Sequence, residues 1–149
     1  MHRFFGGFAQ PLRWPIHKNF SRIHCIYYIC QAITWNMVIL KDKLTIPQLS
    51  EMAAELYVDM IKAVADVRLG ILAIDAELHS DLEQLLLEGG SLQEDLWGFN
   101  IYPEIEGDDF IEFDSLINIR PRQNNRSKTV EDESIQLRIR EIVNNFVSR

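Results

Sequence analysis

The strongest constraint on how this chain can fold is a break in composition between residues 36 and 37. The first 36 residues contain four Lys or Arg side chains and no Asp or Glu, whereas all 22 acidic residues lie from Asp42 onward. Residues 37–149 therefore carry 11 basic and 22 acidic side chains, a formal charge of −11. A chain of 149 residues is long enough for one domain with a hydrophobic core and too short to suggest two. We expect one folded domain over residues 37–149, preceded by a non-domain extension over residues 1–36.

The extension allows three interpretations, which the sequence leaves open. A basic, acid-free N-terminus is typical of a targeting sequence. A membrane anchor over residues 23–40 is the second, but polar side chains interrupt that run, and a membrane-spanning helix needs about 20 mostly apolar residues. The third is a start misassigned at Met1, because Met37-Val-Ile-Leu-Lys resembles an ordinary cytosolic start that runs into a short strand.

Cysteine content and charge limit the environment and the partners. Cys25 and Cys30 stand alone, and neither a metal site nor a disulfide scaffold can be built from two such residues. The cysteine-free domain fits a reducing compartment, so we predict a cytoplasmic location. Its negative charge argues against a general nucleic-acid or anionic-membrane binder, although a local basic patch is compatible with it. We expect no membrane association for residues 37–149.

The first half of the domain predicts a short strand after Met37, a helix and a β-hairpin. Thr45 followed by Gln48 forms a capping-box pattern that opens a helix over residues 46–56. Over residues 59–67 apolar and polar side chains alternate, as in a strand. A short turn at residues 68–70 then leads to a second strand over residues 71–74.

The second half predicts helix, two strands and helix. Residues 75–87 read as a helix that ends at Gly89-Gly90, and its expected buried stripe is Ala76, Leu78, Leu82, Leu85 and Leu86. Strands follow over residues 96–102 and 110–120, separated by an acidic loop, and the second has the clearest alternation in the chain. Apolar residues at helical spacing from Ile135 to Phe146 predict a final helix.

The predicted order is β-α-β-β-α-β-β-α. Strands joined by hairpins imply an antiparallel or mixed sheet, with helices packed mainly on one face. The fold class is therefore α+β in a single domain.

Four segments of the domain form a distinctive set: Glu-Leu-His-Ser-Asp (77–81), Leu-Leu-Leu-Glu-Gly-Gly-Ser (85–91), Gln-Glu-Asp-Leu-Trp-Gly (93–98) and a long block over residues 111–127 that includes Asn-Ile-Arg-Pro-Arg-Gln-Asn-Asn-Arg-Ser. With these segments the chain resembles an uncharacterised bacterial and archaeal family, domain of unknown function five-six-seven-four. The resemblance runs from about Met37 to near the C-terminus and implies no activity. The family pattern has a Gly-Gly pair before Glu-Leu-His, where this chain has Asp75-Ala76, so the turn into that helix is expected to differ.

The segment after the long strand is a candidate anion site. Arg120, Arg122, Arg126 and Lys128 lie within nine residues and alternate with amides that include Asn124 and Asn125. Guanidinium groups grip phosphate or carboxylate bidentately, and amides and a following helix N-terminus add donors. The segment could bind an anionic ligand or nucleic-acid phosphate, could be a protein interface, or could pair internally with nearby acids.

His79 is the single histidine in the sequence of residues 37–149 and the main candidate for acid–base chemistry. On a helix it would share a face with Asp75 and Glu83, with Glu77 and Asp81 beside it. Such spacing could orient an imidazole for proton transfer or hold a metal, although the second histidine of a zinc helix is missing. A surface or salt-bridged histidine is the structural alternative. We predict neither a metal nor a cofactor.

Polar residues on the long strand could complete a site. Asp95 precedes Trp97, and Glu112, Asp114 and Asn118 would share the polar face of the strand with Arg120. If this face is buried, its paired charges have a structural role. If it lines a cleft, the same residues could form the floor of a catalytic site. Trp97 is expected in the core, with a stacking platform as the alternative.

Two functions follow. The first is a small domain that binds a phosphate-bearing ligand, a nucleotide or nucleic acid among them, and that could hydrolyse it. In this hypothesis Arg120, Arg122, Asn124, Asn125 and Arg126 bind the anion, and His79, Glu77 and Asp114 are catalytic. The alternative is a non-catalytic protein-interaction or oligomerisation module. Convergence of His79, Asp114 and the arginines in one pocket would favour the first.

Overall fold

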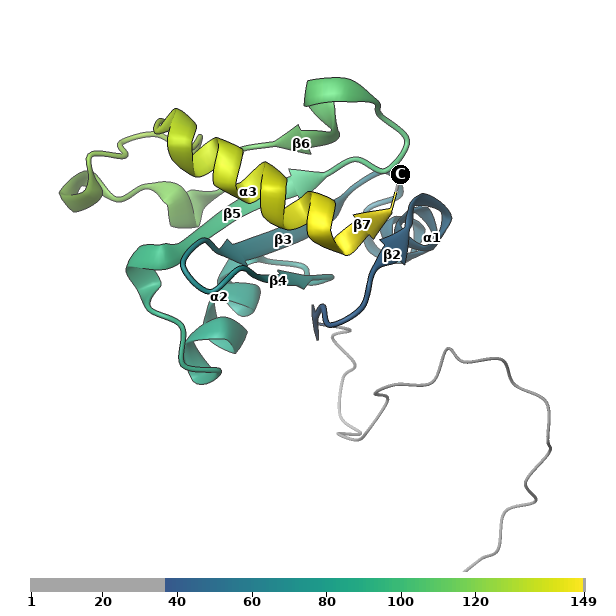
Figure 1. The fold of residues 1–149 in the computed structure, drawn as a ribbon, viewed down its shortest axis with the longest axis horizontal. Helices are drawn as coiled ribbons and strands as arrows, with labels where there is room; N and C mark the ends of the chain where they lie inside the picture. Colours follow the sequence, from purple (N-terminus) through teal and green to yellow (C-terminus); the bar gives the residue numbers. More distant parts are fainter. Residues whose placement is uncertain (1–36, 149) are drawn as a thin grey trace, which may run out of the picture. The chain divides into compact units, whose positions relative to one another are not determined.

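A computed structural model describes residues 37–148 as an α+β domain (Figure 1). The main sheet has five antiparallel strands in the order β1-β4-β3-β5-β6. These are β1 (Val38–Ile39), β4 (Ile71–Ile74), β3 (Ile61–Asp66), β5 (Leu96–Ile101) and β6 (Ile111–Glu112). The three interpretations of residues 1–36, and Cys25 and Cys30 with them, lie outside the described residues.

The predicted first helix and hairpin are confirmed. Helix α1 (Ile46–Leu56) begins at the expected capping box, where the backbone N–H of Thr45 donates to Oε1 of Gln48 at 2.9 Å. Strands β3 and β4 pair directly, with Ala63 opposite Ile74 and Asp66 opposite Ile71. The alternation of apolar side chains therefore predicted both the elements and their pairing.

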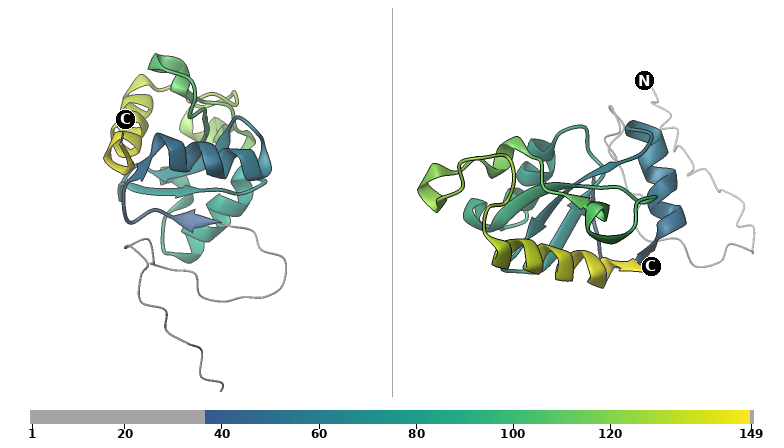
Figure 2. Two further views of the ribbon diagram at one scale, coloured as in Figure 1. Left: turned by 90° about the vertical axis from the view of Figure 1, so that its right-hand side faces the viewer. Right: turned by 90° about the horizontal axis from the view of Figure 1, so that it is seen from above.

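The sheet has two different faces because side chains alternate along each strand. One face carries Ala63, Phe99 and Ile101 in a large hydrophobic cluster that also contains residues of α1 and of α3 (Glu133–Phe146). The opposite face carries Val64 and Leu96 in a smaller cluster with helix α2 (His79–Glu88). Two of the three helices thus share one cluster; α3 runs along the sheet and α1 lies across its end (Figure 2).

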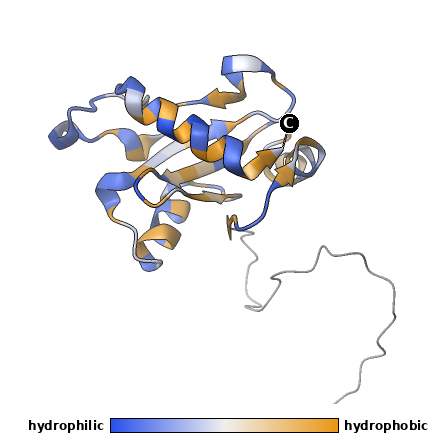
Figure 3. Cartoon of the chain, viewed as in Figure 1, coloured by the Kyte–Doolittle hydropathy of each residue, from blue (hydrophilic) through white to orange (hydrophobic). Residues whose placement is uncertain are grey.

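The final helix and the chain end are held by local contacts. Asp132 caps α3, its side chain accepting from the N–H of Ser134 at 2.8 Å. The helix buries Ile139, Ile142 and Val143, and hydrophobic and hydrophilic residues alternate along its ribbon (Figure 3). Strand β7 (Val147–Ser148) then pairs in parallel with β2 (Leu44–Thr45).

The expected start of the second helix is wrong. Helix α2 begins at His79, and Asp75 lies before it in the left-handed region, with φ 71°. Leu78, predicted in the buried stripe, is 57% exposed, whereas Leu82 and Leu86 are buried as expected. Asp75 therefore does not share a helical face with His79. The left-handed region is one that glycine, and after it Asn and Asp, adopt most readily.

The expected long strand over residues 110–120 is also wrong. Pairing stops after Glu112, and short 3-10 helices follow, η3 (Leu116–Asn118) and η4 (Pro121–Gln123). The Asn118 side chain takes the place of a strand backbone: its Nδ2 donates to the Gly98 carbonyl and its Oδ1 accepts from the Gly98 N–H, both at 2.8 Å. The segment approaches so closely that a Cβ at Gly98 would lie 2.5 Å from Oγ of Ser115. Side-chain pairing thus replaces the predicted ladder.

Within the part of the chain that the structure describes, none of the helices has the length and apolar character needed to cross a membrane.

Candidate functional site

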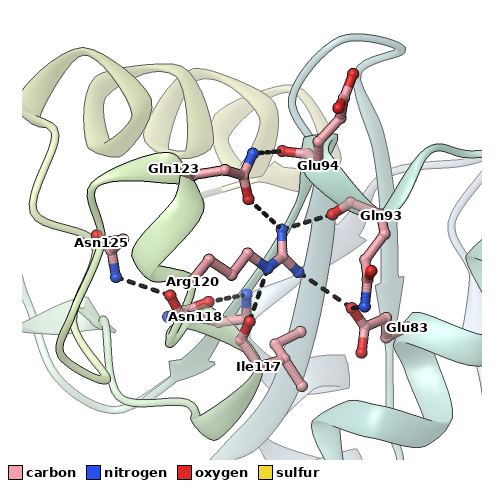
Figure 4. A network of polar contacts seen from close by, with 9 residues as sticks. Glu83, Gln93, Glu94, Ile117, Asn118, Arg120, Gln123 and Asn125 are labelled. Carbon is pink, nitrogen blue, oxygen red and sulfur yellow. Dashed lines mark hydrogen bonds and ion pairs between the residues drawn. The ribbon is translucent and has the colours of Figure 1, made fainter.

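The predicted anion loop is organised around Arg120, which is turned inward (Figure 4). Its Nη2 lies 3.1 Å from Oε1 of Glu83, and both side chains are only about a tenth exposed, 11% and 13%. Its other nitrogens donate to the carbonyls of Gln93 at 2.5 Å and Ile117 at 2.9 Å. The guanidinium also lies 5.3 Å from the ring centroid of Trp97, which is buried in the core as expected. Arg120 therefore ties η4, α2 and the start of β5 together.

The two asparagines of the loop have different places. Asn125 is buried, and its Nδ2 donates to the carbonyls of Asn118, Ser127 and Thr129. Asn124 is exposed in the left-handed region, with φ 61°. The hydrogen bonds of the Asn125 side-chain amide to these backbone carbonyls therefore fix the conformation of the loop.

Arg122 and Arg126 are exposed, in contrast to Arg120. The three arginines therefore do not lie together on one exposed surface, because Arg120 forms an ion pair inside the protein. Lys128 lies 3.5 Å from Oδ1 of Asp114. A ligand-binding role for Arg122 and Arg126 stays a prediction.

A second group of polar side chains lies on the face of the sheet that α2 covers. Strand register places Lys62 opposite Asn100, and Asn100 opposite Glu112, in one row across β3, β5 and β6. Residues directly opposite each other in antiparallel strands point to the same side, so these three side chains are neighbours. They share that face with Val64, which packs against α2. We call Lys62, Asn100, Glu112 and His79 the His79 cluster.

His79, the first residue of α2, lies over this row. Nε2 of its ring lies 2.9 Å from the Phe99 carbonyl oxygen. A carbonyl only accepts, so Nε2 carries the proton and Nδ1 of the neutral ring is an acceptor. Burial lowers the pKa of His79 to about 4, while the Phe99 contact opposes that shift. At neutral pH the imidazole is uncharged, with its tautomer set by the backbone of β5.

The amide of Asn100 is oriented by Glu112. Nδ2 of Asn100 donates to Oε2 of Glu112 at 2.9 Å, and the hydroxyl of Tyr102 donates to the same oxygen at 3.0 Å. An ionised carboxylate only accepts, so the amide nitrogen faces Glu112 and the amide oxygen is turned away from it. That oxygen is buried and has no hydrogen-bond partner among the described residues. Native structures leave few such groups unsatisfied, and a bound ligand or water is the usual reason.

Lys62 supplies the positive charge of the cluster. Its ammonium lies 4.6 Å from the ring centroid of Tyr57. Burial lowers the pKa of Lys62, although Asp114 and Glu112 act in the opposite direction. The hydroxyl of Tyr57 donates to the carbonyl of Glu77, so the aromatic ring also links the end of α1 to the entry of α2.

Of the three predicted catalytic residues, two lie near each other, His79 and Asp114. Asp114 is near enough to His79 to raise the pKa of the imidazole, which places the two in one neighbourhood. Its own carboxylate is about half exposed. Glu77 is exposed and contributes a backbone carbonyl to Tyr57. His79 and Asp114 thus belong near the cluster, with Glu77 beside it.

Two non-glycine residues with left-handed backbone lie at the same end of the sheet, where β3 begins and β4 ends. Val58 has φ 76° and is 82% exposed, and Asp75 has φ 71° and is 4% exposed. Such conformations are unfavourable for β-branched residues and gather at functional sites. Burial, with Glu55 nearby, raises the pKa of Asp75 to about 6. Strain and perturbed acidity therefore coincide at this end of the sheet.

Lys62, Asn100 and Tyr102 were missed from the sequence because none belongs to a recognisable motif. A pairing of residues 62 and 100 could have been found by aligning the two predicted strands in register, which brings both polar residues to one face. Among residues 37–148, no group of three or more His, Cys, Asp or Glu side chains is arranged to hold a metal ion. A surface hollow borders the first turn of α1 and the 103–110 segment and contains none of the predicted site residues; its lining is Ile46, Pro103, Glu104, Ile105, Glu106, Gly107 and Phe110.

Comparison with known proteins identifies a family and no function. No curated protein and no solved structure matches the chain. The model of one family, described as "Protein of unknown function (DUF5674)", matches residues 38–146, which include all the strands of the main sheet and both polar regions described above. By that match the chain belongs to the DUF5674 family.

Proposed function

We propose that the protein binds a small polar molecule at the His79 cluster, with an anionic group of that molecule against Lys62. The observation that carries the proposal is the buried oxygen of Asn100, which has no partner among the described residues. An unpaired buried acceptor costs about 1–3 kcal/mol. A bound ligand that donates to it offsets that cost.

Lys62 is the group suited to the anionic end of the ligand. Glu112 is engaged by Asn100 and Tyr102, and Asp114 lies beside Lys128. Burial lowers the pKa of Lys62 in spite of those two acids. A ligand oxygen with negative charge would compensate for the lost hydration of the ammonium.

Recognition is favoured over proton transfer by the acidity of His79. A catalytic base works best when its pKa lies near the working pH. A pKa of about 4 makes the imidazole a weak base at neutral pH, but leaves it a permanent acceptor. We therefore assign His79 to ligand binding, and the hydrolytic role predicted for it is not part of the proposal.

The proposal is tested by thermal unfolding with a panel of anions: inorganic phosphate, ribose 5-phosphate, adenosine monophosphate and malate at 10 mM, roughly the range in which weak ligands shift the melting temperature. At least one should stabilise the wild type and the Arg122→Ala variant equally, and fail to stabilise Lys62→Met. Arg122 is a matched control because it is an exposed cation outside the cluster.

Two outcomes would contradict the proposal. Stabilisation that disappears in Arg122→Ala and persists in Lys62→Met would move the site to the exposed arginines. Loss in neither variant would show that the anion binds elsewhere.

A further inference from the structure

We infer that the ligand carries a hydrogen-bond donor, a hydroxyl or an amine, next to its anionic group. Asn100 and His79 both accept a hydrogen bond from this donor. This inference rests on the proposed function, since it concerns the same site. It adds a substrate class: hydroxylated or aminated phosphate and carboxylate compounds, as opposed to simple anions.

The first step is that the Asn100 oxygen and Nδ1 of His79 are both acceptors and that neither group can become a donor. The Asn100 amide cannot turn over, because its nitrogen would leave Glu112 and its oxygen would then meet a carboxylate. The His79 ring is held with Nε2–H on the Phe99 carbonyl, which leaves the lone pair on Nδ1. Both orientations are set by groups that only accept hydrogen bonds.

The second step is that the two acceptors are neighbours. The Asn100 side chain lies within hydrogen-bonding reach of the imidazole, and a hydrogen bond between them would favour the protonated ring. In the neutral ring the proton is on Nε2, so Nδ1 has none to give to the Asn100 oxygen, which has no partner among the described residues. Two lone pairs therefore share a region with no proton between them. A ligand O–H or N–H satisfies them, whereas an ionised oxygen would be repelled by both.

The third step is burial. Asn100 is 5% exposed and His79 is 8% exposed, so bulk water does little to compensate an unmatched ligand. Sites built to hydrogen-bond a substrate group discriminate strongly against analogues that lack it. The donor should therefore decide which anions are accepted.

The test uses three matched probes with the full-length protein. These are sn-glycerol 3-phosphate, which has hydroxyls; O-phosphoethanolamine, which has an ammonium; and propyl phosphate, which has neither. Dissociation constants are measured by ¹H–¹⁵N NMR titration. The donor-bearing probes should bind about tenfold or more tightly than propyl phosphate, and the stronger of the two shows whether the donor is a hydroxyl or an amine. The Nδ1 resonance of His79 should shift only with donor-bearing probes.

Glu112→Gln is the decisive variant, because Glu112 is exposed and the substitution keeps its shape. A Gln side chain can donate to the Asn100 oxygen, so the Asn100 amide is free to reverse. The preference for donor-bearing probes over propyl phosphate should then fall to about twofold or less.

The outcomes separate the two proposals. Equal binding of all three probes by the wild type, with loss in Lys62→Met, would overturn the donor inference and leave the proposed function standing. A donor preference that survives Glu112→Gln would overturn the role of the amide orientation. Failure of every probe to bind the wild type would contradict both proposals.

Discussion

The protein has two polar regions at opposite ends of β5, and they differ in how their cations are paired. Around Arg120, near the start of the strand, the guanidinium meets Glu83 and two carbonyls. Around His79, near the end of the strand, the ammonium of Lys62 lies against the ring of Tyr57, and the Asn100 oxygen has no partner among the described residues. The cation of the first region is paired with an acid inside the protein, whereas the cation of the second lies against an aromatic ring.

This difference bears on how a polar sequence block is interpreted. Residues 120–128 carry many cations and amides, yet Arg120 and Asn125 are engaged with the protein itself. Residues of the His79 cluster are scattered over three strands and a helix and look ordinary one at a time. Protein stability is commonly sacrificed at functional sites, so the His79 cluster, where burial lowers the pKa of both His79 and Lys62, is the better candidate.

The largest expected effect is that of Arg120→Ala on stability. Removing the guanidinium leaves Glu83 nearly buried without its partner and two carbonyls without a donor. Breaking such a pair costs about 3 kcal/mol or more. Urea unfolding should show that loss, whereas Arg122→Ala should stay within about 0.5 kcal/mol of the wild type. A loss below about 1 kcal/mol for Arg120→Ala would mean that Arg120 is available for a ligand after all.

The sequence predicted elements whose signals are local. The capping box at Thr45, the alternation in β3 and the spacing of Ile139, Ile142 and Val143 all follow from periods of 2 or 3.6, and each element is present. The alternation after Phe110 failed because Asn118 pairs with Gly98 through its side chain. A long-range contact of that kind leaves no trace in local periodicity.

The candidate site was predictable only in part, for a related reason. His79 stood out as the histidine of the domain, and Asp114 as an acid on the expected strand. The role of Asn100 depends on its register with Lys62 and Glu112, and its free oxygen depends on the direction of the amide. Neither property is encoded at a single position.

Asp75→Asn should stabilise the protein by about 3 kcal/mol at pH 7. Burial raises the pKa of Asp75 from 3.8 to about 6, and one pKa unit corresponds to about 1.4 kcal/mol. Because the folded state holds the proton more tightly, the contribution of Asp75 to stability is fully present below pH 3.8 and is lost as pH rises toward 6. Asparagine removes the charge and tolerates the left-handed backbone. Urea unfolding between pH 3.5 and 8 should show the gain in stability shrinking toward zero at the acid end.

The same experiment also reports on His79, whose contribution to stability changes with pH in the opposite direction. Its pKa is lowered from 6.5 to about 4, so the stability it contributes is present above pH 6.5 and is lost as pH falls through 4. In the wild type the two groups oppose each other between about pH 4 and 6. Asp75→Asn should therefore lose stability on acidification more steeply than the wild type over that range. Parallel curves for the two proteins would show that Asp75 does not titrate as the structure indicates.

The smallest expected effect is that of Lys62→Met on stability. It tests whether the His79 cluster contributes less to the fold than the Arg120 region does. Lys62 is partly buried and lies against the ring of Tyr57, and methionine can fill much of the same space without a charge to desolvate. The change should alter the free energy of unfolding by less than about 1 kcal/mol in either direction, while removing the response to anions. A loss above about 2 kcal/mol would show that Lys62 supports the fold as Arg120 does. The two polar regions would then differ in composition and not in role, because a residue whose charge the fold requires is not one kept available for a ligand.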